Sequence, residues 1–260
     1  MIDNRPGAGG IVGADLVAKA SPDGYTLMLA SIAHTALPSL HKTLPYDIVK
    51  DFAPVTMLVA FSHLLLVHPS VAAKSVKELI ALAKAKPGQL NYSSGGNGSS
   101  AHLNMELFKS MTSTNVVHVP YNGAGPAVIG FVAGEANMGF WSVSAAGQLA
   151  KAGRLRALAS SGEKRLPSFP ELPTVAEAGV SGFEASTWTG VLAPAGTPKP
   201  IIVKLHADLA RILQLPEVKE RLATVDFEPV GNTPEQFGAI IKKEVVKWAK
   251  VVKDSGAKTD

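Results

Sequence analysis

The stretch LNYSSGGNGSSAHL, from Leu90 to Leu103, decides the fold of the region around it. A short strand-like run enters a glycine- and serine-rich turn, and a helix predicted over 101–111 leaves it. This order places free backbone N–H groups at the positive end of a helix dipole, where anions bind. Four side chains of the turn can also donate hydrogen bonds to carboxylate or phosphate oxygens: Ser94, Asn97, Ser99 and Ser100. The stretch predicts an anion-binding loop; the alternative is an ordinary strand-to-helix connection with Ser99 as its N-cap.

Length and composition indicate a folded protein with room for one large domain or two lobes. The chain has 260 residues, of which 46% are hydrophobic and 18% charged, which is typical of a globular protein. It has no cysteine, so disulfides and thiolate chemistry are excluded. No apolar run is long enough to cross a bilayer, no signal-peptide pattern follows Met1, and no direct membrane insertion is expected.

The net charge of +4 favours anionic partners. Nucleic acid is not expected among them, because the lysines are scattered along the chain. The clearest basic stripe, Lys243, Lys247 and Lys250, follows the spacing of a solvated helix face.

Strand-like and helix-like segments alternate along the chain, which predicts an α/β fold with mixed, mostly parallel sheets. Strands are predicted at 25–30, 54–59, 64–67, 90–94, 116–119, 138–141, 155–159 and 190–193. Helices are predicted near 14–20, from Ser75 to Pro87, at 101–111, from Gly125, at 145–152, after Thr174, and three times at the C-terminus. In the last helix, Thr233 and Gln236 form a capping box, and an apolar stripe that includes Phe237 and Trp248 predicts core packing.

Three predicted strands in the middle of the chain end in small polar residues. These ends are Ser93-Ser94, Tyr121–Gly125 and Trp141-Ser142. Parallel strands place such ends along one edge of the sheet, where open α/β sheets bind their ligands. We therefore expect a ligand site at this edge.

The residues exclude several kinds of chemistry there. The run Gly96–Ala101 matches a dinucleotide-binding fingerprint, but the next strand, 116–121, lacks the acidic residue that would hold the ribose. Ser99, Ser100 and His102 are close in sequence, yet neighbours on one helical turn point in different directions, and no G-x-S-x-G motif occurs. His102 is interpreted as a helix-start residue that fixes the loop.

Metal and cofactor chemistry is not expected either. The seven histidines show no metal-ligand spacing, and His34 and His41 are placed in a predicted loop. The residues are equipped to hold a ligand and poorly equipped to transform it, so no catalytic residue, metal or cofactor is predicted.

Seven segments, spread over the chain, resemble the substrate-binding proteins of the tripartite tricarboxylate transporters, the Bug family of periplasmic receptors. They are Asn4–Gly10, Ser21–Leu27, Leu44–Asp47 with Lys50–Pro54, the anion-binding loop, Val119–Gly123, Leu172–Gly179 and Ala193–Pro198. The resemblance implies the two-lobed, Venus-flytrap fold of type II periplasmic binding proteins. Lobe I would comprise residues 1–64 and 186–260 and lobe II residues 65–185, with the ligand cleft between them.

The same resemblance implies a periplasmic, monomeric receptor that is not an enzyme. It would bind a small organic carboxylate by hinge closure and deliver it to the membrane subunits of a tripartite transporter. Matching the family's motifs implies these ligand-binding residues: Ser94, Asn97, Gly98, Ser99 and Ser100, with Tyr121 and Gly123 beside them. Ser31 would face them from lobe I, and Thr187 and Trp188, near the return crossing, are further candidates.

Two departures from the family's pattern bear on the ligand. Trp141-Ser142 stands where many relatives carry an aspartate, which argues against amino-acid ligands and points to an apolar or aromatic ligand body. Asn122 stands where relatives often have lysine, so one cationic contact is absent. Di- and tricarboxylates and aromatic acids are the expected ligand classes.

Two rival functions remain open at this point. The chain could present a bound carboxylate to a membrane histidine kinase, or it could be a hydrolase that uses Ser99 or Ser100. A further expectation concerns the N-terminus. Relatives begin with a signal peptide, a strand, a glycine-rich loop and a helix before the segment that starts here at Asn4. We therefore expect the first strand and helix of lobe I to be missing from this chain.

Overall fold

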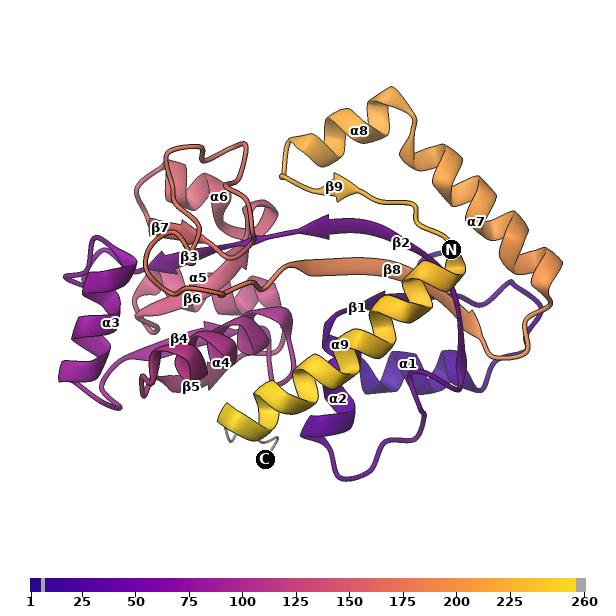
Figure 1. Ribbon diagram of the computed structural model, residues 1–260, viewed down its shortest axis with the longest axis horizontal. Coiled ribbons are helices and arrows are strands. Elements are labelled where there is room, and N and C mark those ends of the chain that lie inside the picture. The colour runs from indigo at the N-terminus through magenta and orange to yellow at the C-terminus, as the bar shows by residue number, and fades with distance from the viewer. Residues whose placement is uncertain (6–7, 256–260) are drawn as a thin grey trace. The chain divides into compact units, whose positions relative to one another are not determined.

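The computed structural model describes residues 1–5 and 8–255. Residues 6–7, inside the Asn4–Gly10 segment, and 256–260, at the end of predicted lobe I, lie outside this description. The described chain forms two compact units (Figure 1). Unit 1 takes its residues from 1–60, 188–223 and 228–260, and unit 2 comprises 61–187 and 224–227.

Unit 1 contains a four-stranded sheet in the order β1-β8-β2-β9 and the C-terminal helices. Its elements are a 3-10 turn at Ala8–Gly10, α1 (Ile11–Ala18), β1 (Met28–Ser31), α2 (Ala33–Leu40), β2 (Phe52–Phe61), β8 (Thr187–Pro194), α7 (Lys199–Leu213), α8 (Pro216–Ala223), β9 (Glu228–Pro229) and α9 (Pro234–Ser255). The long strands β2 and β8 are neighbours in the sheet (Figure 1). β1 pairs antiparallel with β8, and β9 pairs antiparallel with β2, so the mostly parallel sheet that we predicted is not found in this unit.

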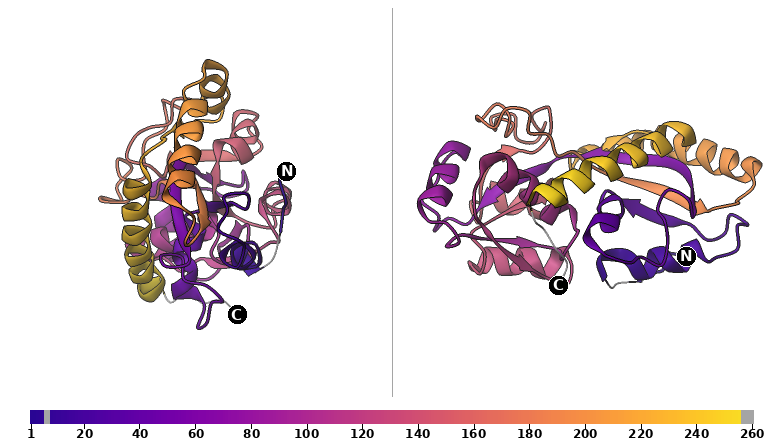
Figure 2. Two further views of the ribbon diagram at one scale, coloured as in Figure 1. Left: turned by 90° about the vertical axis from the view of Figure 1, so that its right-hand side faces the viewer. Right: turned by 60° about the horizontal axis from the view of Figure 1, so that its bottom comes forward.

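Helix α9 supplies much of the core of unit 1. Thr233 and Gln236 form the predicted capping box, with the Gln236 amide 3.3 Å from Thr233 Oγ1 and the Thr233 amide 3.0 Å from Gln236 Oε1. Of the predicted apolar stripe, Phe237, Ile241 and Trp248 are fully buried. The helix is a single unbroken rod that packs against α2 (Figure 2). The predicted cap and core face are both confirmed.

Unit 2 contains a five-stranded sheet in the order β5-β4-β6-β3-β7. Its elements are β3 (His63–Val67), α3 (Val76–Ala85), β4 (Asn91–Ser94), α4 (Ser100–Thr112), β5 (Val117–Pro120), α5 (Ala124–Ala133), β6 (Met138–Ser142), α6 (Val143–Lys151) and β7 (Arg156–Ser160). β4 is parallel to β5 and β6, whereas β3 is antiparallel to both β6 and β7. Four strands therefore run in one direction and β3 alone runs against them, which is the mixed, mostly parallel pattern expected.

Helices cover both faces of this sheet. Strand residues alternate between the two faces, so that Leu65 and Phe140 pack with α3 and α4, while Leu64 and Leu66 pack with α5 and α6. Strands buried on both faces read as continuous apolar runs, which is why β3 has the sequence HLLLV. The polar ends of β4, β5 and β6 are thereby held on a rigid three-layer support.

Two local predictions were wrong. The segment after Thr174 forms its capping hydrogen bonds with Glu177, at 3.0 and 3.1 Å, but continues only as turns up to Gly179, whose φ of +113° ends any helical path. His34, placed in a loop from sequence, lies in α2, which accommodates Pro38 close to its C-terminus and ends at Leu40.

Candidate functional site

The C-terminal ends of three neighbouring strands form the centre of the candidate site. β5, β4 and β6 are adjacent and parallel, with Ser94 opposite Pro120 and Tyr92 opposite Met138. Each strand is followed by a helix, so the N-termini of α5, α4 and α6 all begin at this edge of the sheet. The predicted convergence of the three polar strand ends is confirmed, and it brings together the positive ends of three helix dipoles.

The loop between β4 and α4 is shaped by its own hydrogen bonds. Ser94 Oγ is 3.1 Å from the Gly96 amide, and the Ser99 amide donates to the Gly96 carbonyl at 3.1 Å. Gly96 and Gly98 have φ values of +113° and +78°, which glycine adopts without strain. Ser99 is the N-cap of α4, with Oγ accepting from the His102 amide at 3.4 Å. These hydrogen bonds and φ values define one conformation of the loop.

Two histidines brace this loop from below. His102 Nδ1 accepts the Gly98 amide at 3.0 Å, and His118 Nε2 lies 2.5 Å from Ser94 Oγ. The two imidazole rings are stacked with centroids 4.4 Å apart, and Tyr92 stacks on His118 at 4.7 Å. The interpretation of His102 as a residue that fixes the loop is confirmed.

The polar groups beneath the stack satisfy one another. The Tyr92 hydroxyl donates to Glu106 Oε1 at 2.7 Å, and Lys109 Nζ lies 2.6 Å from the same oxygen. Burial, and then the Glu106 charge, raises the pKa of Tyr92 far above its usual value. Because Lys109 is already paired with this carboxylate, it stabilises the residues beneath the loop and not the loop itself.

These bonds divide the predicted loop residues into two groups. The Gly98 amide and the Ser94 hydroxyl are occupied by His102 and His118, so these two residues shape the loop. By contrast, the backbone amides of three residues have no hydrogen-bond partner within the described part of the chain: Asn97, Ser100 and Ala101. Together with the hydroxyls of Ser99 and Ser100, these amides form the donor set that an anion can use.

Backbone hydrogen bonds connect the loop after β5 to the loop between β4 and α4. The Tyr121 amide donates to the Ser94 carbonyl at 3.0 Å, and the Gly123 amide to the Gly95 carbonyl at 3.2 Å. The Tyr121 hydroxyl is directed elsewhere, because it donates to Glu135 Oε2 at 2.7 Å, and this bond raises the pKa of the half-buried tyrosine. Tyr121 and Gly123 thus contribute backbone to the edge.

The third strand end contributes a helix cap and a core residue. Ser142 is the N-cap of α6, with Oγ 3.3 Å from the Ala145 amide. The Trp141 ring is only 4% exposed and packs with Leu64 and Phe131 in the core. The Trp141 ring therefore has almost no exposed surface for the predicted apolar contact with a ligand.

Two predicted residues belong to unit 1. Ser31 ends β1 opposite Thr189 of β8, and its amide donates to His34 Nδ1 at 3.1 Å. Trp188 is buried, with its ring edge-on to Phe237 at 5.1 Å. Ser31 and Trp188 therefore lie on neighbouring strands of one sheet. The last predicted residue, Thr187, is the buried first residue of β8 and falls in unit 2, because the boundary between the units lies between Thr187 and Trp188.

Sequence reasoning missed His63, the first residue of β3. Its ring is 3% exposed, and Nε2 lies 3.4 Å from Ser100 Oγ. On the other side of the ring, Nδ1 lies 3.1 Å from Asn104 Nδ2 and 3.3 Å from Thr187 Oγ1. No local sequence signal pointed to this contact, because the partners are 37, 41 and 124 residues away along the chain.

The pair of Ser100 and His63 does not form a hydrolytic site. A serine nucleophile needs a histidine base oriented by a carboxylate, whereas Nδ1 of His63 faces an amide and a hydroxyl. Burial lowers the pKa of His63 to about 4, which makes it a weak base. Within the described residues there is also no group of histidines and carboxylates placed to hold a metal ion, and no helix long and apolar enough to cross a membrane.

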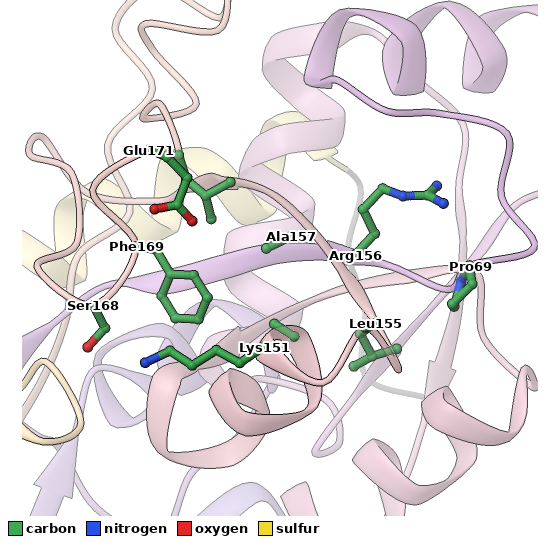
Figure 3. A pocket seen from close by; sticks show the side chains of 11 residues that line it. Pro69, Lys151, Leu155, Arg156, Ala157, Ser168, Phe169 and Glu171 are labelled. Carbon is green, nitrogen blue, oxygen red and sulfur yellow. The ribbon is translucent and has the colours of Figure 1, made fainter.

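A separate cavity of about 570 Å³ lies along the edge strand β7 of unit 2 (Figure 3). Lys151 extends beneath the Phe169 ring, with Nζ 5.2 Å from the ring centroid, and Arg156 points away from that ring (Figure 3). Arg156 is committed to the Val71 and Ala73 carbonyls, both at 3.1 Å. None of the predicted ligand residues lines this cavity, so it is distinct from the loop edge.

Comparison with known proteins assigns the family. The family described as "Tripartite tricarboxylate transporter family receptor" matches residues 1–257. "Protein BugT" of Bordetella pertussis is 38% identical over 260 residues, covering 99% of this chain and 80% of that protein. The chain is therefore a member of the tripartite tricarboxylate transporter receptor family, a family of solute-binding receptors that are not enzymes.

Two solved structures are similar to this chain. The structure "R. palustris Rpa4515 with adipate" has a TM-score of 0.93 at 36% identity and covers 100% of this chain and 87% of its own. "MatC (Rpa3494) from Rhodopseudomonas palustris with bound malate" has a TM-score of 0.88 at 32% identity, covering 95% and 85%. The chain thus has the periplasmic-binding-protein fold of this family, as predicted.

The buried histidines make the stability of the protein depend on pH. Burial lowers the pKa of His34 and of His63 to about 4, and burial together with the charges of His102 and Lys109 lowers that of His118 to about 3. Below pH 6.5 the unfolded chain takes up protons that the folded chain does not, so the free energy of unfolding falls as the pH falls from about 6.5 to about 4. Each buried histidine accounts for up to roughly 3 kcal/mol of this loss.

Urea unfolding at pH 7.5, 6 and 5 measures this loss directly, and His63→Gln should reduce it by the share of one histidine. A free energy of unfolding that stays constant from pH 7.5 to 5 would contradict the assignment of neutral, buried imidazoles.

Proposed function

We propose that this chain is an extracytoplasmic solute-binding protein for a small organic carboxylate, bound through the first turn of α4. The observation that carries the proposal is the set of unpartnered amides at Asn97, Ser100 and Ala101, in a loop that internal hydrogen bonds hold in place. Backbone amides at a helix N-terminus bind anions without a cationic side chain. Adipate and malate, named with two structures similar to this chain, belong to the ligand class that fits.

For the ligand of this chain we propose a chemical class. Di- and tricarboxylates fit a seat built from amides and hydroxyls, and an aromatic acid fits through its carboxylate in the same way. In this account Ser94, Gly98, Tyr121, Gly123 and Ser142 shape the edge, whereas Asn97, Ser99 and Ser100 contact the anion. Ser31, Thr187 and Trp188 are proposed to contribute from residues outside the loop, and Trp141 to support it from the core.

We further propose that the two lobes, residues 1–64 with 186–260 and residues 65–185, close by a hinge on the ligand. The closed, monomeric receptor would act in the periplasm and deliver its ligand to the membrane subunits of a tripartite transporter. Presentation of the same ligand to a membrane histidine kinase is the alternative. Both functions require the same ligand-bound form, so measuring ligand binding does not separate them. Pull-down with solubilised transporter subunits or with a kinase ectodomain does.

Calorimetry tests the loop assignment, with adipate, malate, citrate and benzoate as probes. Ser100→Ala removes one hydroxyl donor and should weaken the binding of the best probe by about 1–3 kcal/mol. Gly98→Ala should weaken it as well, because a Cβ at a φ of +78° strains the loop that aligns the donors.

Matched controls separate binding from stability. Gly88→Ala introduces a Cβ at a φ of +75° outside the loop and is the control for Gly98→Ala. Ser110→Ala changes an exposed serine of α4, the helix that begins at Ser100, and is the control for Ser100→Ala. Both controls should bind the probe as the unchanged chain does, and Gly88→Ala should lose about as much stability as Gly98→Ala. Unchanged affinity in both Ser100→Ala and Gly98→Ala would overturn the assignment.

Small-angle scattering tests the hinge. With adipate, or the probe that binds best, at saturation, the radius of gyration should fall relative to the ligand-free protein, because closure brings two lobes together. Gly98→Ala, measured at the same probe concentration, is the control for effects of the solute itself. An unchanged radius of gyration in a sample shown by calorimetry to be saturated would refute hinge closure.

A further inference from the structure

His63 is a buried imidazole whose two nitrogens both have polar neighbours. It begins β3, and its neighbours come from α4 (Ser100 and Asn104) and from the start of β8 (Thr187). A neutral imidazole has one N–H donor and one acceptor nitrogen, so the neighbours decide which nitrogen carries the proton.

The neighbours on the Nδ1 side make that nitrogen the acceptor. Asn104 Nδ2 lies 3.1 Å from His63 Nδ1 and 3.5 Å from the Ala185 carbonyl oxygen, so the NH₂ group donates toward that carbonyl and also faces the ring nitrogen. The opposite amide orientation would place Oδ1 against that carbonyl, with two acceptors facing each other. The Thr187 hydroxyl, 3.3 Å from Nδ1, can donate to the same lone pair. These contacts favour the tautomer that carries the ring proton on Nε2.

This tautomer fixes the role of the Ser100 hydroxyl. Nε2–H of His63 points at Ser100 Oγ over 3.4 Å, so the hydroxyl oxygen is the acceptor in this contact. The proton of the Ser100 hydroxyl must then point away from His63. Ser100 is the first residue of α4, and its own amide and that of Ala101 are among the unpartnered donors of the loop.

We propose that His63 is a positioning residue, which as the neutral Nε2–H tautomer turns the Ser100 hydroxyl into a hydrogen-bond donor toward the ligand. The part that concerns ligand rests on the proposed function, since it requires the anion to sit at the first turn of α4. It adds a selection rule: the ligand group that receives the Ser100 proton must offer an acceptor atom, as an ionised carboxylate does. Burial keeps the ring in its neutral form by lowering the pKa of His63 to about 4.

The tautomer is measured without any ligand. Long-range ¹H–¹⁵N spectra of the full chain labelled in its imidazole nitrogens, with His63→Gln to assign the signals, distinguish a protonated from an unprotonated ring nitrogen. The expected result is an unprotonated Nδ1 and a protonated Nε2 at pH 7. The Nδ1–H tautomer would overturn the inference, because Nε2 would then accept the Ser100 proton and consume the donor.

A double-mutant cycle tests the coupling to ligand, with adipate or the best-binding carboxylate as the probe. His63→Leu should weaken binding by about tenfold in the unchanged background and leave it nearly unchanged in the Ser100→Ala background. His63→Gln, whose side-chain NH₂ can still donate to Ser100, should retain more affinity than His63→Leu. Additive losses in the cycle would mean that His63 has only a structural role and would overturn the inference.

The two proposals fail in different ways. Unchanged affinity in Ser100→Ala overturns the proposed binding site and this inference with it. Affinity that depends on Ser100, together with the Nδ1–H tautomer or an additive cycle, overturns the inference alone. If His63→Leu does not fold, the spectra of the unchanged chain and the His63→Gln variant still decide between the two tautomers.

Discussion

The candidate site depends on hydrogen bonds that hold the loop before α4 in place while the first amides of the helix remain unpaired. A loop of glycines and serines would otherwise have many conformations, and ordering it on binding would cost conformational entropy. Here His102 accepts the Gly98 amide and His118 contacts the Ser94 hydroxyl, so these bonds constrain the loop without any contribution from a ligand. The donors at Asn97, Ser100 and Ala101 are thereby preorganised. Preorganisation raises the affinity for a small anion because less conformational entropy is lost on binding.

The chemistry of this support explains why neutral histidines suit it. The loop must bind a negative charge with its own amides, and a buried carboxylate in direct contact with it would repel that ligand. Imidazoles accept and donate hydrogen bonds without a charge when burial lowers their pKa, as it does for His63, His102 and His118. The buried carboxylate of Glu106, beneath the stack, is paired with Lys109 at 2.6 Å. The residues beneath the loop therefore include neutral histidines and an ion pair, Glu106 with Lys109, whose two charges balance each other.

Much of this arrangement could be predicted from the sequence, since it depends on local patterns. Strand, loop and helix follow one another in Leu90–Leu103, Ser99 has the spacing of an N-cap, and the polar ends of parallel strands must meet at one edge. His63 could not be found in this way, because its contacts with Asn104 and Thr187 depend on how β3 pairs within the sheet. The family resemblance implied Trp141 as a ligand residue, because it stands where relatives carry an aspartate; in the structure Gly139 leaves room for its indole, which packs in the core.

The central claim is that the open amides of the first turn of α4 are the anion seat, and amide chemical shifts test it most directly. The ¹H–¹⁵N correlation spectrum of the full chain would be recorded during a titration with adipate, with adipamide, the uncharged diamide of the same chain length, as the control. The account predicts that the amides of Asn97, Ser100 and Ala101 shift strongly with adipate and little with adipamide. Saturable binding of adipate that leaves these three amides unmoved, and shifts instead those around Lys151 and Phe169, would contradict it.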